Sequence, residues 1–180
     1  MAMTLLTTNT HTSNSDSESS FESSIDSTYK LYIFKFIDIN PATDGAKFTC
    51  QFNVASASGY DENITSTAFR AYHDEADSAT AFAYLTANDQ DNDDQVFQHL
   101  NTELGNGGDE CLTGELHLFD PSNTTFKKHF YARTNGHRSN DATQEFYVGG
   151  YVNSTTAVTN VQFKMDSGNM DGIIKMYGVG

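Results

Sequence analysis

Hydrophobic and polar residues alternate in short runs along most of the chain. The clearest run is 47–54, whose apolar members are Phe48, Cys50, Phe52 and Val54. Alternation with a period of two is typical of a strand with one buried face. We therefore expect Phe48 and Phe52 to point into a core. The run 29–39 is apolar on both sides, which predicts a strand that is covered on two faces.

Further short runs rich in β-branched and aromatic residues are separated by polar turns. They occupy residues 64–72, 81–85, 111–119, 125–132, 144–152, 157–165 and 173–177. Eight or nine short strands with polar connections predict an all-β fold. We expect an antiparallel β-sandwich that is jelly-roll-like.

One segment has helical spacing instead, and its apolar residues are Val96, Phe97, Leu100 and Leu104. Asp94 precedes this segment as an N-cap, and Gly105 follows it as a stop. These features predict one short helix after the acidic loop 88–94.

The N-terminal residues form a polar arm in which serines alternate with acidic residues. Such a segment buries too little apolar surface to offset its ordering entropy, and it gains order against a partner. The sequence therefore divides into an extended arm, 1–24, and a β-sandwich domain, 25–180. We expect the arm to contribute little to folding and more to assembly.

The chain is strongly acidic, with 180 residues, 10 Lys and Arg, 24 Asp and Glu, and a net charge of −14. This balance argues against nucleic acid and against anionic membranes as partners. One basic cluster stands out, formed by Lys127, Lys128, Arg133 and Arg138. We interpret it as a candidate interface for an acidic neighbour, such as the arm of another copy.

The acidic loop spaces Asp89, Asp91 and Asp93 like the start of a calcium loop. An EF-hand requires Gly at its sixth position and Glu at its twelfth, where this chain has Asp94 and Leu100. The EF-hand is excluded, and we expect a solvent-exposed loop whose affinity for calcium is weak.

The remaining polar residues show no catalytic or cofactor motif. The six histidines lack metal-ligand spacing, no Gly-x-Ser-x-Gly motif is present, and no phosphate-binding loop occurs. We therefore assign no catalytic, cofactor-binding or metal-binding residues, and expect a protein that is not an enzyme.

Cys50 and Cys111 are the two cysteines of the chain. Two buried free thiols and one disulfide are both compatible with their positions in strand-like segments. Free thiols are the interpretation that we favour, because nothing else in the sequence indicates secretion.

The C-terminal region resembles the ending of many tailed-phage virion domains. The similarity lies in residues 156–163, 167–170 and 172–179, which match a strand after a Ser/Thr-Ala-Ile turn, a Gly-Asn loop and a closing Leu-Tyr-Gly-Ile strand. Shorter matches occur at 48–53, 59–60 and 113–119. Met176 and Val179 replace the Leu and Ile of the family, which are apolar exchanges.

This resemblance implies a virion structural protein, located in the virion, with no catalytic residues to transfer. A chain this short fits a capsid decoration or cement subunit better than a complete fibre. Its partners would be the major capsid protein or neighbouring copies, in a homo-oligomer for which a trimer is one option.

Two alternatives stay open. A tail-fibre or receptor-binding module for host surface glycans would have an exposed aromatic platform beside carboxylates. A sandwich-fold hydrolase, such as a depolymerase, would have paired carboxylates in a cleft. A decoration subunit would instead have a large self-interface.

Overall fold

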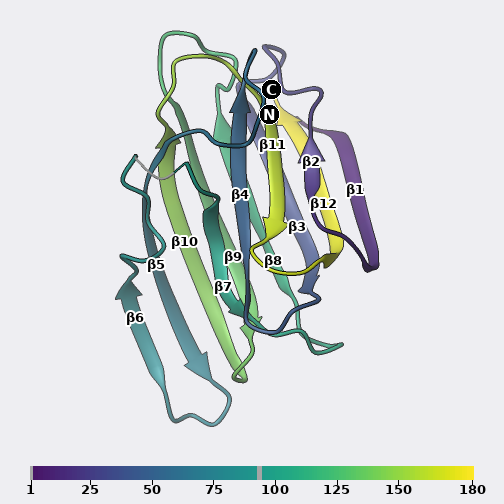
Figure 1. Cartoon of the computed structure of the whole chain (residues 1–180), viewed down its shortest axis with the longest axis vertical. Coiled ribbons are helices and arrows are strands. Elements are labelled where there is room, and N and C mark those ends of the chain that lie inside the picture. Colours follow the sequence, from purple (N-terminus) through teal and green to yellow (C-terminus); the bar gives the residue numbers. More distant parts are fainter. Residues whose placement is uncertain (1, 93–94) are drawn as a thin grey trace.

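The computed structural model describes residues 2–92 and 95–180, which form twelve strands (Figure 1). The strands are β1 (Met3–Asp16), β2 (Ser19–Phe21), β3 (Leu31–Pro41), β4 (Ala46–Val54), β5 (Ile64–Asp74), β6 (Thr80–Tyr84), β7 (Gln98–Leu104), β8 (Leu112–Phe119), β9 (Lys128–Arg138), β10 (Ala142–Val152), β11 (Val158–Met165) and β12 (Met170–Val179). All the strand pairs are antiparallel. The expected all-β, antiparallel fold is therefore confirmed.

The strands form two runs. The long run has the order β1-β12-β3-β8-β9-β10-β5-β6, and the short run has the order β7-β4-β11-β2. The runs join where Leu104 of β7 pairs with Arg138 of β9. On the opposite side, Asn9 of β1 donates from Nδ2 to Oγ of Ser19 in β2, at 3.0 Å. The strand order is therefore nearly closed around its core.

The core lies between the two runs and is dominated by phenylalanine. The ring of Phe36 in β3 is 5.0 Å from Phe48 in β4 and 5.1 Å from Phe163 in β11. Phe52 and Phe130 are 5.1 Å apart in the same layer. Phe48 and Phe52 are fully buried, which confirms the orientation that alternation predicted for them.

The arm forms part of the sheet, contrary to the expectation that it gains order only against a partner. β1 pairs with β12 at the edge of the long run, and β2 pairs with β11 at the edge of the short run. Phe21 of β2 is buried and its ring lies 5.2 Å from Phe34. The arm is ordered because its threonines suit a strand and its one phenylalanine fills the core.

The prediction of a short helix is wrong, because β7 occupies the segment and the described residues contain no helix. Leu100 and Leu104 are four positions apart, which is an even number and therefore also places both on one side of a strand. The spacing of these leucines therefore fits both a helix and a strand, and pairing with β4 makes the segment a strand. The proposed N-cap, Asp94, lies outside the described residues, as does Asp93.

The strand expected at 29–39 is β3, and its covered face is built by Tyr32, Phe34 and Phe36. In the acidic loop, Asp91 is exposed as expected, whereas Asp89 is half-buried and accepts a hydrogen bond from the Tyr84 hydroxyl at 2.6 Å. Both cysteines are free thiols, and only Cys50 is fully buried.

Candidate ligand-binding face

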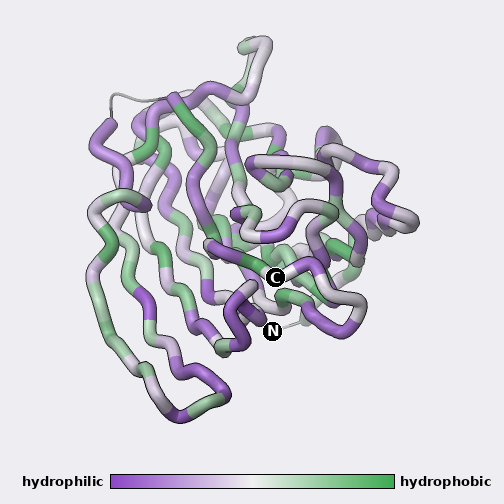
Figure 2. The backbone as a smooth tube through the Cα atoms, turned by 60° about the horizontal axis from the view of Figure 1, so that its bottom comes forward, coloured by the Kyte–Doolittle hydropathy of each residue, from purple (hydrophilic) through white to green (hydrophobic). Residues whose placement is uncertain are grey.

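The outer surface of the long run carries rows of side chains that cross six or seven strands. Residues paired in an antiparallel sheet share a face, so the register fixes each row. One row is Leu5, Tyr177, Ile33, His117, Tyr131, Gly149 and Thr67. The next is Lys175, Lys35, Glu115, Arg133, Tyr147 and Phe69. Figure 2 shows the alternation of hydrophobic and hydrophilic residues along the strands.

Aromatic side chains cluster on this outer face. The Tyr131 ring stacks on His117 at 4.5 Å and lies 5.7 Å from Phe119. The Tyr147 ring stacks on Phe69 at 4.9 Å. Tyr131 is 43% exposed and Phe119 is 37% exposed, so part of this aromatic surface is open to solvent. The face is held rigid by the sheet beneath it.

A hollow of about 360 Å³ opens between these rings at Gly149. Gly149 pairs with Tyr131 on one side and Thr67 on the other, and Tyr147 lies two residues away along β10. A Cβ atom added at Gly149 would meet no atom within 4 Å. The floor of the hollow is therefore the backbone at Gly149, where there is no side chain. We refer to Phe69, Tyr131, Tyr147 and Gly149 as the aromatic platform.

Charged groups form the rim beside the platform. Arg133 donates from Nε and Nη2 to the two carboxylate oxygens of Glu145, at 3.0 and 3.1 Å, and its guanidinium lies 5.6 Å from the Tyr147 ring centroid. Glu115 pairs with Lys35 and lies 2.9 Å from Nε2 of His117. These contacts place Arg133, Glu145, Glu115 and Lys35 along the rim, with Arg133 over the Tyr147 ring.

The same contacts set the charge of Glu115. Burial raises the pKa of Glu115, but hydrogen bonds from Lys35 and His117 outweigh burial and hold the pKa below its ordinary value. Glu115 is therefore a carboxylate at neutral pH. It can accept hydrogen bonds from a ligand, and it is not a proton donor.

The four cations of the predicted interface do not form one cluster. Lys128 and Arg138 stand at opposite ends of β9, about 33 Å apart for a strand of this length. Lys128 is fully buried, and its Nζ donates to the carbonyl oxygens of Phe126 and Ser154 at 3.2 and 3.1 Å. Burial lowers the pKa of Lys128.

The other three cations lie in different environments and have different partners. Arg138 is 6% exposed and donates to Glu103 Oε2 at 2.5 Å. Lys127 lies over the Tyr151 ring, with Nζ 4.8 Å from its centroid. Of the four predicted residues, only Arg133 belongs to the rim of the platform. Sequence reasoning missed the platform itself, although Tyr131, Tyr147 and Tyr151 occur at the alternating positions of their strands.

A second hollow, of about 590 Å³, lies over the short run and is bordered by residues 87–90 and 95–97. Its lining includes Phe97, His99 and Lys164, and the Lys164 ammonium lies 4.0 Å from the Phe97 ring centroid. Burial lowers the pKa of His99, so its imidazole is neutral at pH 7. None of the described residues that line this hollow takes part in a stacked ring pair, in contrast to those of the outer face.

Comparison with known proteins gives no relative from which a site could be transferred. No family model, no curated protein and no solved structure matches this chain. Among the described residues, no helix has the length and apolar character needed to cross a membrane.

Proposed function

We propose that this chain is a non-enzymatic virion protein that binds surface glycans through the aromatic platform. The observation that carries the proposal is the hollow at Gly149, which is flanked by the Tyr131 and Tyr147 rings and has Glu115 and Arg133 at its rim. An exposed aromatic surface beside carboxylates is the feature that separates a glycan-binding module from the other two candidate functions.

The chemistry of the platform suits a sugar ring. A pyranose presents C–H groups on its faces and hydroxyl groups around its edge. Aromatic faces carry partial negative charge and attract C–H groups, so a ring stacked on Tyr131 or Tyr147 is stabilised. Carboxylates and guanidinium groups then pair with the hydroxyl groups around the sugar. The rows of side chains, which cross six or seven strands, would accommodate several sugar units.

The virion setting rests on the resemblance of the C-terminal region to tailed-phage virion domains. The two facing runs of strands are compatible with the jelly-roll-like sandwich of that family, and we include this finer description of the fold in the proposal. A receptor-binding role on a tail fibre is supported both by this resemblance and by the aromatic platform.

The two carboxylates beside the platform do not suit the hydrolase alternative. Glu115 and Glu145 line a shared hollow of about 480 Å³, as paired catalytic carboxylates would. A glycosidase acid needs a raised pKa, whereas the pKa of Glu115 is lowered and Glu145 is held by Arg133 in a two-point ion pair. We therefore propose binding without hydrolysis.

A capsid decoration or cement subunit is the second candidate, and one observation favours it. β6 pairs with β5 on one side and has no partner strand on its other side among the described residues; on it Phe82 is 76% exposed and Tyr84 is 52% exposed. An exposed apolar edge is suited to pairing with a neighbouring protein. The Phe82 ring lies 5.6 Å from the ring of Phe69, so a protein docked on this edge would cover part of the aromatic platform.

The glycan proposal can be tested on an array of purified bacterial surface polysaccharides. We expect the wild-type chain to bind a subset of them, and Tyr131→Ala and Tyr147→Ala each to weaken that binding about tenfold. Phe126→Ala is the matched control, because it removes an aromatic ring that is 69% exposed in the loop before β9.

Binding that resists both tyrosine substitutions, or the absence of any bound polysaccharide, would contradict the proposal. Release of shorter sugars from a bound polysaccharide would identify a hydrolase instead. The second candidate is tested by comparing incorporation of wild-type and Phe82→Ser chains into particles, with polysaccharide binding of Phe82→Ser measured alongside because Phe82 contacts Phe69.

A further inference from the structure

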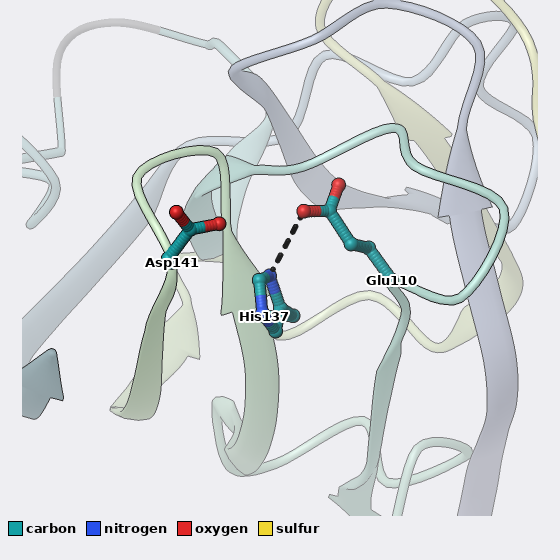
Figure 3. A group of neighbouring side chains, drawn as sticks. All are labelled: Glu110, His137 and Asp141. Atoms are coloured by element: carbon teal, nitrogen blue, oxygen red, sulfur yellow. Dashed lines mark ion pairs between the residues drawn. The ribbon is translucent and has the colours of Figure 1, made fainter. Parts of the chain in front are cut away.

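Three chelating side chains meet at the far end of β9. Glu110 precedes β8, His137 lies near the end of β9, and Asp141 lies in the turn to β10 (Figure 3). One ligand atom from each residue lies within 4.8 Å of the other two. The sequence did not indicate this group, because its members are brought together only by pairing of β8, β9 and β10.

The imidazole of His137 has a nitrogen without a hydrogen bond. Nδ1 is sealed from solvent and makes no hydrogen bond, although Glu110 Oε1 lies 3.2 Å away. Two atoms that bind one tetrahedral zinc ion are separated by about 3.4 Å, given metal–ligand distances of about 2.0–2.2 Å. The separation of 3.2 Å between His137 Nδ1 and Glu110 Oε1, which is also an ion-pair distance, is close to that of two ligands to one ion.

Neighbouring groups orient both Glu110 and His137 in a way that suits cation binding. The other oxygen of Glu110, Oε2, accepts a hydrogen bond from the Gly107 amide at 2.6 Å, which leaves Oε1 directed toward His137. The second ring nitrogen of His137, Nε2, lies 3.5 Å from Glu75 Oε1. A carboxylate behind a histidine is the usual arrangement that orients the imidazole of a metal ligand.

We propose that Glu110, His137 and Asp141 bind one divalent transition-metal ion of the zinc class. One imidazole and two carboxylates form a ligand set that suits zinc, cobalt or manganese better than calcium. Arg138 does not compete for these carboxylates, because it points to the opposite side of β9 and pairs with Glu103. The bound ion would connect the segment before β8 to the β9–β10 hairpin.

This site is separate from the aromatic platform. His137 and Tyr131 are six residues apart on β9, which corresponds to about 20 Å along a strand. A test of metal binding is therefore independent of a test of glycan binding. It predicts an effect on stability, because a ligand that binds only the folded state raises the melting temperature.

The test uses the full chain without an affinity tag, freed of metal by a chelator. Zinc is titrated by calorimetry, and cobalt by its visible absorption, which reports nitrogen and oxygen ligands. The variants are His137→Gln and Asp141→Asn. Asn suits position 141, where φ is +56° and Asn is tolerated. His73→Gln is the control, since His73 lies outside the three-residue group and pairs with Asp77 at 3.2 Å.

We expect one zinc ion per wild-type chain, a higher melting temperature with zinc, and at least tenfold weaker binding in both site variants. The control should bind as the wild type does. Absence of stoichiometric binding by the wild type would overturn the proposal and leave His137 as a neighbour of Glu110 and Glu75 with no metal-binding role. Equal losses in His137→Gln and His73→Gln would overturn it as well, by showing adventitious binding to surface histidines.

Discussion

Two adjacent glycines in β10 have opposite reasons to be glycine. A Cβ atom at Gly150 would lie 2.8 Å from the Ser66 Cβ, so close packing of β10 on β5 requires a glycine there. At Gly149 an added Cβ meets open space. Packing therefore explains Gly150 and leaves Gly149 unexplained, whereas a ligand that occupies the hollow would account for it.

At the level of a core residue, Phe48→Ala should lower the free energy of unfolding by about 3–5 kcal/mol. Phe48 is fully buried, and its ring lies 5.0 Å from Phe36, so truncation leaves a cavity. Urea melts measure this loss. Phe126→Ala, at an exposed ring, should change stability by no more than about 0.5 kcal/mol. A loss below about 1 kcal/mol for Phe48→Ala would contradict the packing described for β4.

Single residues were predictable from the sequence where alternation alone decides their direction. Phe48 and Phe52 follow that rule, and both are buried. Lys128 does not, because its charge suggested an exposed position although it occupies an inward position of β9. Its burial depends on two carbonyl acceptors, Phe126 and Ser154, of which the second is distant in sequence and becomes available only when the chain is folded.

Among the elements, the nine segments expected as strands from 29 onward all contain strands. The two errors, over the arm with β1 and β2 and over β7, have a common cause. Neither segment has an alternation that is strong enough to decide its structure alone. The partner strands β12 and β4 decide it through pairing, which no local pattern reports.

Because the arm contributes β1 and β2 to the sheet, deletion of residues 1–24 should destabilise the chain. Deletion would leave β12 as an unpaired edge and would remove Phe21 from the core. Loss of a buried phenylalanine costs about 3–5 kcal/mol, so we expect the melting temperature to fall by at least about 6 °C. Phe21→Ala in the full chain separates the core contribution from the pairing contribution. An unchanged melting temperature after deletion would show that the arm is dispensable for folding.

At the scale of the whole molecule, the nearly closed strand order produces two different surfaces. The inner side of the long run supplies the phenylalanine core, and its outer side carries the aromatic platform. The sequence predicted the inner side well, because burial imposes a regular pattern. The platform was not predictable, because it combines residues from β5, β9 and β10 whose alignment depends on register.

The most direct test of the central claim is the affinity of Gly149→Val for the polysaccharide that the array selects. The chain has nine tyrosines and no tryptophan, so tyrosine fluorescence reports binding near Tyr131 and Tyr147. Valine suits a strand and has room at position 149, so the fold should keep its stability while the hollow is filled. Gly108→Val, at another glycine with open space, is the control. We expect at least a tenfold loss of affinity for Gly149→Val only, and an unchanged affinity would contradict glycan binding at the platform.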